Sequence, residues 1–253
     1  MKLPDAARLM SGVLPGCRGK NGIRSGTSQN MAEPDPHMNG SESENSGLPV
    51  ILYFVADWPN LITLTGLCGG VLAIFFALEQ NYPAAIIAML WAVAFDWYDG
   101  VVARNLAGRS EAHRSIGAAM DSLVDLVTSG VGPAILLLSV TDFSGWAYPG
   151  ALAIIMAGVL RLSYFNVYGV DSSGKIAGLT IDNSPIVVSL VFFLESFIDH
   201  SAFVSILYVA IVVMAALHVA PFRLPKAPQV FYYIFTAYVV AATVGYAVIW
   251  ATD

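Results

Sequence analysis

The chain carries little charge and little cysteine for its length. Of its 253 residues only 12% are Asp, Glu, Lys or Arg, and 57% are hydrophobic. Soluble domains have about 25% charged residues, so the composition excludes an ordinary soluble domain and indicates a membrane protein. The two cysteines, Cys17 and Cys68, lie far apart and give no sign of a disulfide framework or a metal–thiolate site. We expect contact with membrane lipids and no nucleic-acid partner.

Seven apolar segments are long enough, or nearly long enough, to cross a membrane, which takes about 20 residues. They cover approximately residues 60–78, 83–104, 115–140, 146–167, 184–198, 202–220 and 229–251. The fifth is the shortest and fits a full crossing least well. The sequence therefore predicts an all-α integral membrane protein.

The basic residues indicate how these segments are oriented. Five of the 12 lie in the first thirty residues, and three follow or end the second segment. Two more lie near the end of the fourth segment or after it, and the last two lie just before the seventh. The opposite connections, around residues 79–81, 141–145 and 195–201, contain no Lys or Arg. By the positive-inside rule the amino terminus is cytoplasmic, and an odd number of spans places Asp253 outside.

The first 46 residues are rich in Gly, Ser, Asn and Pro, which predicts a disordered cytoplasmic tail. Its charge turns from basic to acidic at Met31, so residues 1–30 are either a weak targeting segment or the product of a start codon placed too early. We favour the second interpretation. Residues 48–58 predict a short helix along the cytoplasmic surface, unless they simply begin the first span.

Four aspartates lie where the second and third apolar segments should be in the membrane: Asp96, Asp99, Asp121 and Asp125. A charged side chain at the bilayer centre costs about 2.5–3.5 kcal/mol on insertion scales. Spacings of three and four residues place each pair on one helix face. Hard divalent cations prefer several carboxylate oxygens, so the pattern points to a metal-assisted active site.

Small residues and an arginine accompany the acids. Gly100 follows Asp96 by four residues, and Gly117 precedes Asp121 by four, so a ligand could approach the backbone closely. Arg104 offers a bidentate phosphate donor at the cytoplasmic rim. An ion-coupled transporter is the alternative from another class of protein. Against it, the acids gather at one depth, and no second polar cluster reaches the far face.

The motif Asp96-x2-Asp99-Gly100-x2-Ala103-Arg104, followed by Gly117-x3-Asp121-x3-Asp125, resembles the signature of the CDP-alcohol phosphotransferases. Residues 121–134 and 161–166 are similar to the phosphatidylserine synthase branch of that family. One departure is the length of the connection, because twelve residues separate Arg104 from Gly117, more than is usual in the family. We interpret the extra residues, around 112–115, as a loop insertion. Alternatively, this segment could start its helix differently or contact the acceptor or the lipid headgroup.

The resemblance implies six core spans, a homodimer, and a polar cavity open to the cytoplasmic leaflet. It implies two divalent ions, Mg²⁺ or Mn²⁺, at the pyrophosphate of a CDP-lipid. The implied metal ligands are the four aspartates, and Asp125 would also be the general base. The implied CDP-lipid site consists of Asn60, Thr63, Gly100, Ala103, Arg104 and Gly117. Arg161 and Asn166 would bind the acceptor or a phosphate, unless Arg161 snorkels to a lipid phosphate.

The implied reaction transfers a phosphatidyl-type group from CDP-diacylglycerol, or from archaeal CDP-archaeol, to the hydroxyl of L-serine with release of CMP. Glycerol 3-phosphate, inositol phosphate or another amino alcohol remain open as acceptors. The chain then divides into a tail (1–46), a catalytic membrane core with the surface helix and six spans (47–226), and an additional transmembrane helix (227–253).

Overall fold

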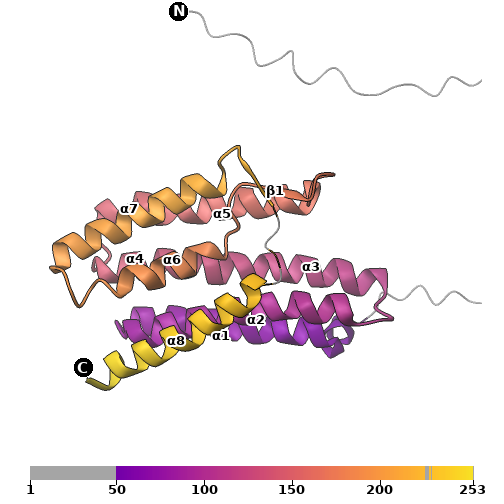
Figure 1. The fold of residues 1–253 in the computed structure, drawn as a ribbon, viewed down its shortest axis with the longest axis horizontal. Helices are drawn as coiled ribbons and strands as arrows, with labels where there is room; N and C mark the ends of the chain where they lie inside the picture. Colours follow the sequence, from indigo (N-terminus) through magenta and orange to yellow (C-terminus); the bar gives the residue numbers. More distant parts are fainter. Residues whose placement is uncertain (1–49, 226–227, 229, 253) are drawn as a thin grey trace, which may run out of the picture. The chain divides into compact units, whose positions relative to one another are not determined.

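The computed structural model describes residues 50–225, 228 and 230–252, and this part is built almost entirely of helices (Figure 1). The tail predicted for residues 1–46, including Cys17, lies outside the described residues. The eight α-helices of the described part are α1 (Trp58–Leu78), α2 (Tyr82–Asn105), α3 (Glu111–Asp125), α4 (Gly132–Val140), α5 (Tyr148–Tyr168), α6 (Asn183–Phe192), α7 (His200–His218) and α8 (Val230–Thr252). Two short strands, β1 (Lys175–Ala177) and β2 (Arg223–Pro225), pair antiparallel.

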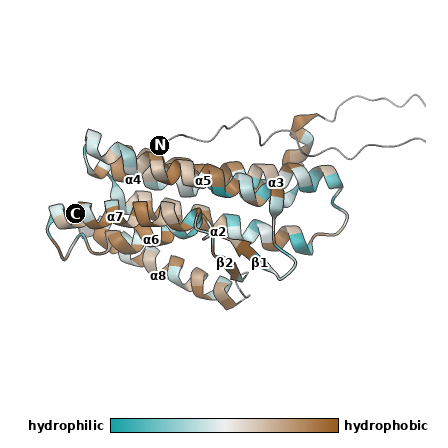
Figure 2. Cartoon of the chain, turned by 90° about the horizontal axis from the view of Figure 1, so that it is seen from above, coloured by the Kyte–Doolittle hydropathy of each residue, from teal (hydrophilic) through white to brown (hydrophobic). Residues whose placement is uncertain are grey.

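Six helical stretches are long and apolar enough to cross a membrane, which confirms the prediction of an all-α integral membrane protein. They are Trp58–Leu78, Tyr82–Asn105, Glu111–Val140, Gly145–Tyr168, His200–His218 and Val230–Ala251. Figure 2 shows hydrophobic residues along most of the length of these helices. This distribution is typical of a protein that passes through a membrane several times.

The fifth apolar segment forms a shorter helix than the sequence suggested. α6 has 10 residues, and turns replace the helix after Phe192. Ten helical residues rise about 15 Å, half of a hydrocarbon core about 30 Å thick. α6 begins in the interior and runs to the end of the molecule where α7 begins (Figure 1). The preceding non-helical segment is tolerated at that depth because it lines a cavity, as described below.

α1 and α2 form a tight antiparallel pair. A Cβ atom at Gly66 would lie 3.2 Å from the carbonyl oxygen of Ala92, and one at Gly69 would lie 3.3 Å from that of Ala88. Small residues allow such close approach of helix backbones in membranes. At the turn between the helices, the Asn81 side chain accepts a hydrogen bond from the Ala84 amide and caps α2.

α3 continues into α4 through a π-helical segment, Leu126–Val131. Pro133 lacks an amide hydrogen, and its ring conflicts with the carbonyl four residues earlier, which explains why the regular ladder widens here. The widening begins directly after Asp125. Single π-helical turns are frequent at functional sites, and here one lies directly next to Asp125.

The carboxyl-terminal helix α8 packs along α2. Trp91 Nε1 donates a hydrogen bond of 3.1 Å to Thr243 Oγ1, and the hydroxyls of Tyr98 and Thr236 lie 2.6 Å apart. The division of the chain at residue 227 stays a prediction.

Near the start of the described part, Ile51–Ala56 forms a 3₁₀ helix that an extended Asp57 separates from α1. These residues are thus a distinct element, and its position at a membrane surface stays a prediction.

Candidate metal and active site

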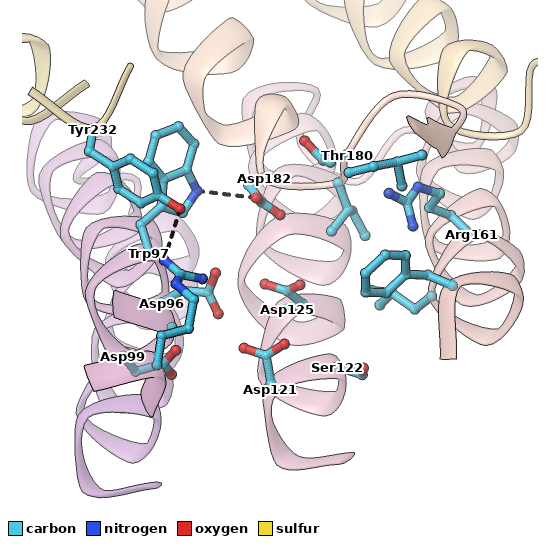
Figure 3. Close-up of a pocket in the computed structure, with 16 residues that line it drawn as sticks. Asp96, Trp97, Asp99, Asp121, Ser122, Asp125, Arg161, Thr180, Asp182 and Tyr232 are labelled. Atoms are coloured by element: carbon cyan, nitrogen blue, oxygen red, sulfur yellow. Dashed lines mark hydrogen bonds between the residues drawn. The ribbon is translucent and has the colours of Figure 1, made fainter. Parts of the chain in front are cut away.

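The four predicted aspartates face one another across a single site. Asp96 and Asp99 come from α2, and Asp121 and Asp125 come from α3 (Figure 3). Carboxylate oxygens of Asp96, Asp99 and Asp121 all lie within 4.8 Å of one another. The helical spacing in the sequence therefore identified side chains that the fold brings together.

A fifth carboxylate, Asp182, joins this cluster from the start of α6. One carboxylate oxygen from each of Asp182, Asp96 and Asp125 lies within 4.8 Å of the other two. Trp97 Nε1 donates a hydrogen bond of 3.1 Å to Asp182 Oδ2 (Figure 3). The sequence analysis missed Asp182 because it stands alone, 57 residues after Asp125, in a connection between two apolar segments. Its only sequence signal is its place directly before the fifth apolar segment.

The cluster has the chemistry of a divalent cation site. Within the described residues, both ion pairs join other side chains, so no arginine or lysine forms an ion pair with these carboxylates. Asp96 Oδ1 is buried and has no hydrogen-bond partner there. Buried polar atoms normally have partners, and hard cations take several carboxylate oxygens. The residues present therefore fit Mg²⁺ or Mn²⁺.

Two adjoining cavities open at the cluster. The carboxylate cavity, of about 270 Å³, contains all five carboxylates together with Arg104, Arg161 and Thr180 in its lining. The Asn60 cavity, of about 200 Å³, is lined by Asn60, Thr63, Gly100, Ala103, Arg109, Arg114 and Gly117, among others. Asp99, Gly100 and Asp121 line both. A ligand with two connected parts could thus lie in both cavities at once.

The first helix contributes directly to the site. Thr63 Oγ1 donates a hydrogen bond to Asp99, and both side chains are buried. Asn60 donates from Nδ2 to the carbonyl oxygen of Phe54 at 2.8 Å. Five of the six residues predicted to bind a CDP-lipid therefore line the Asn60 cavity. The sixth, Arg104, lies in the carboxylate cavity and donates to the Tyr232 hydroxyl at 3.3 Å.

The two glycines of the motif have different surroundings. A Cβ atom at Gly117 would lie 2.8 Å from Asn60 Oδ1 and 3.1 Å from Arg109 Nη2, so this glycine allows α3 to pack against α1. A Cβ atom at Gly100 would meet only Arg104 Nη1, at 3.5 Å. Gly100 therefore borders open space that a ligand can use, whereas Gly117 supports the shape of the cavity.

The longer connection before Gly117 places Arg109 against the beginning of α1. Arg109 Nε donates a hydrogen bond of 2.8 Å to Asp57 Oδ2, and the two side chains form an ion pair with only 9% and 7% of their surfaces exposed. Arg109 Nη2 also donates to Asn60 Oδ1 at 3.3 Å. The loop insertion expected around residues 112–115 is wrong, because these residues form the beginning of α3. Arg109, in the connection just before them, and Arg114 both line the Asn60 cavity.

Arg161, on α5, is buried and lines the carboxylate cavity. Its Nε donates to the carbonyl oxygen of Leu179 at 3.1 Å, and its guanidinium lies 5.2 Å from the centre of the Phe165 ring. This position contradicts a snorkelling arginine, whose charge would lie at the surface. Asn166 does not line the cavity and accepts a hydrogen bond of 3.0 Å from Ser122 Oγ.

The segment that carries Asp182 is held by its neighbours. Gly178 has a positive φ of 67°, and a Cβ atom there would overlap the carbonyl of His218, so only glycine fits without strain. Leu179 donates its amide hydrogen to Leu217 at 3.0 Å. Earlier in the connection, hydrogen bonds from Ser173 lower the pKa of Asp171 to about 2.

The fold and the site define a membrane protein with several spans and a buried group of carboxylates between two of its helices. The chain belongs to the CDP-alcohol phosphatidyltransferase family, whose model matches residues 56–221. The matched region contains all five carboxylates and both cavities apart from Tyr232. The family suggested by the sequence motif is thereby confirmed.

Several curated relatives are similar to parts of the chain. The archaetidylserine synthase of Methanothermobacter thermautotrophicus is 39% identical over 55% of this chain and 58% of its own length. The CDP-diacylglycerol–serine O-phosphatidyltransferase of Bacillus subtilis is 36% identical over 43% of this chain and 60% of its own. That of Methanocaldococcus jannaschii is 28% identical over 74% and 83%. The chain thus spans less than two thirds of the first two proteins.

Proposed function

We propose that the protein transfers a phosphatidyl-type group from a CDP-activated lipid to the hydroxyl of L-serine and releases CMP. The observation that carries the proposal is the pair of facing carboxylate helices, α2 and α3, between two adjoining cavities. Family membership supports the type of reaction, and the printed names of the relatives support serine as the acceptor.

Each part of the site has a task in this reaction. Asp96, Asp99, Asp121 and Asp125 would hold one or two divalent ions. Bound there, such ions would neutralise charge on the pyrophosphate of the CDP-lipid. Asp125 would also accept the proton of the serine hydroxyl as general base. The serine oxygen then bonds to the lipid-side phosphorus, and the bond from that phosphorus to the oxygen of CMP breaks.

The Asn60 cavity would take the nucleotide part of the donor. It adjoins the carboxylates, and Arg114, which forms no ion pair among the described residues, gives it positive charge that suits a phosphate-bearing ligand. Arg104, at the rim of the other cavity, would contact the same phosphates. Holding donor and acceptor next to each other lowers the entropic cost of the reaction. By the positive-inside rule we place the site on the cytoplasmic side, and a homodimer is proposed from the family resemblance alone.

The test is an assay of the purified full chain in detergent with CDP-diacylglycerol or CDP-archaeol and a panel of alcohols. Serine, glycerol 3-phosphate, inositol phosphate and ethanolamine are offered separately, and CMP and the lipid product are measured. We expect a product with serine, its loss in EDTA, and recovery with Mg²⁺ or Mn²⁺. Absence of CMP release with every donor and acceptor would reject the proposal and favour an ion-coupled transporter instead.

A further inference from the structure

We propose that Asp182 and Arg161 together form a subsite for a zwitterionic amino acid, in which Arg161 binds the carboxylate and Asp182 binds the ammonium group of the acceptor. This inference rests on the proposed function and deepens it. It gives Asp182 a role in selecting the acceptor, separate from the four aspartates of the family motif.

Arg161 lines the carboxylate cavity and forms no ion pair among the described residues. The residue is only 6% exposed, and its one hydrogen bond among the described residues leaves from Nε. Neither of the two ion pairs in that part of the chain involves it. Asp182 and Asp125 attract its charge only from beyond ion-pair distance, so the planar guanidinium can still bind a carboxylate through two parallel hydrogen bonds. An anionic group of a ligand would therefore be stabilised at this position.

Asp182 offers the opposite charge in the same cavity. Its carboxylate accepts a hydrogen bond from the indole of Trp97, which orients it without neutralising it. Asp182 and Arg161 are farther apart than the 4.0 Å of an ion pair, although both line the cavity. The gap suits a small molecule that carries both charges, as an α-amino acid does.

The position of Asp125 is consistent with this arrangement. Carboxylate oxygens of Asp125 and Asp182 lie within 4.8 Å of each other. In serine, two carbon atoms separate the hydroxyl from the ammonium group. An ammonium held by Asp182 can therefore leave the hydroxyl beside Asp125, where the proposed proton transfer takes place. Figure 3 shows these two carboxylates pointing into the same space, with Arg161 across from them.

The charges also disfavour a phosphate-bearing acceptor. The cavity holds five carboxylates against two arginines, and the pyrophosphate of the donor would offset the charge of bound cations. A doubly charged phosphate monoester would add repulsion from Asp182 and would have Arg161 as its only buried cation. A zwitterion has no net charge and pairs with both residues. Selectivity then comes from repulsion of the wrong acceptor as well as from attraction of the right one.

The first test compares acceptors that lack one charge each. Ethanolamine lacks the carboxylate of serine, and 3-hydroxypropionate lacks the ammonium group. Asp182→Asn should raise the KM for serine at least tenfold, because a hydrogen bond between charged groups is lost. It should also reduce the preference for serine over 3-hydroxypropionate while the KM for the CDP-lipid changes less than twofold. Arg161→Gln should instead reduce the preference for serine over ethanolamine.

Controls separate this role from metal binding and from misfolding. Mn²⁺ titrated into the Asp182→Asn protein should bind within about threefold of the wild type. Asp142→Asn makes the same chemical change outside both cavities and should leave all acceptor preferences unchanged. Asparagine tolerates the positive φ of 47° at this position. If Asp182→Asn does not fold, Trp97→Phe removes the orienting hydrogen bond and should raise the serine KM with the CDP-lipid KM unchanged.

Two results would overturn the inference while leaving the proposed function intact. One is a tenfold or greater loss of Mn²⁺ affinity in Asp182→Asn, which would make Asp182 a metal ligand. The other is an unchanged serine KM and acceptor preference in that variant. If the wild type releases no CMP with any acceptor, the proposed function itself fails and this inference fails with it.

Discussion

Arg109 and Asp57 form a buried ion pair that joins the loop before α3 to the beginning of α1. The arginine Nε donates to Asp57 Oδ2 at 2.8 Å, and its Nη2 reaches the side chain of Asn60. The pair therefore holds the Asn60 side chain in the wall of the Asn60 cavity. It also gives the longer connection between the two motif helices a structural task.

Breaking this pair should destabilise the protein. Removal of one partner of a buried ion pair typically costs about 3–5 kcal/mol, because the remaining charge stays buried without compensation. Arg109→Gln and Asp57→Asn should each lower the unfolding midpoint in detergent and raise the KM for the CDP-lipid. The double variant should lose less than the sum of the two single losses. Additive losses in unfolding free energy would show that the pair is not energetically coupled.

Asp125→Asn should abolish transfer while the protein stays folded. The substitution is nearly isosteric and removes both the proposed base and a charged metal ligand. CMP release should fall by at least a thousandfold, and Mn²⁺ affinity should fall in a calorimetric titration of the same sample. A variant that keeps full activity would remove Asp125 from the mechanism. Asp142→Asn, which makes the same change from carboxylate to amide outside both cavities, serves as the control for general effects of side-chain charge.

Gly117→Ala should weaken binding of the CDP-lipid more than it lowers the maximal rate. The new methyl group would lie 2.8 Å from Asn60 Oδ1 and 3.1 Å from Arg109 Nη2, so these side chains must move. We expect a KM for the CDP-lipid at least fivefold higher, measured at saturating serine. The matched control is Gly145→Ala, where the nearest atom in the way is 4.0 Å distant, in Tyr148. Equal behaviour of the two variants would contradict a role for close packing at Gly117.

Gly178→Ala should disturb the acceptor side of the site. Its φ of 67° strains any other residue, and the methyl group would overlap the carbonyl of His218. Gly174→Ala is the control, since φ there is 75° but nothing lies within 4 Å of the added atom. Both variants carry backbone strain of about 1–2 kcal/mol, and only Gly178→Ala should raise the serine KM. A similar serine KM in both would show that the segment does not depend on this contact.

The motif aspartates could be identified from the sequence because their relationship is local. Asp96 and Asp99, like Asp121 and Asp125, belong to single helices, where a spacing of three or four residues fixes a shared face. The low charge content and the apolar segments likewise determined an all-α membrane protein, since every backbone polar group in a bilayer must be satisfied within helices or closed barrels. These conclusions need no knowledge of how the helices pack.

Tertiary structure alone brought Asp182 into the proposed acceptor side of the site, where the sequence motif had suggested only Arg161 and Asn166. Asp182 reaches the cluster because a non-helical segment, held by Gly178 and the end of α7, enters the bundle at the depth of the other carboxylates. The pairing of Arg109 with Asp57 across 52 residues, and the short length of α6, are decided in the same way. Such contacts depend on the packing of segments distant in sequence, and no local spacing encodes them. The sequence by itself determined which helices carry the motif carboxylates, and the fold decided which further charges surround them.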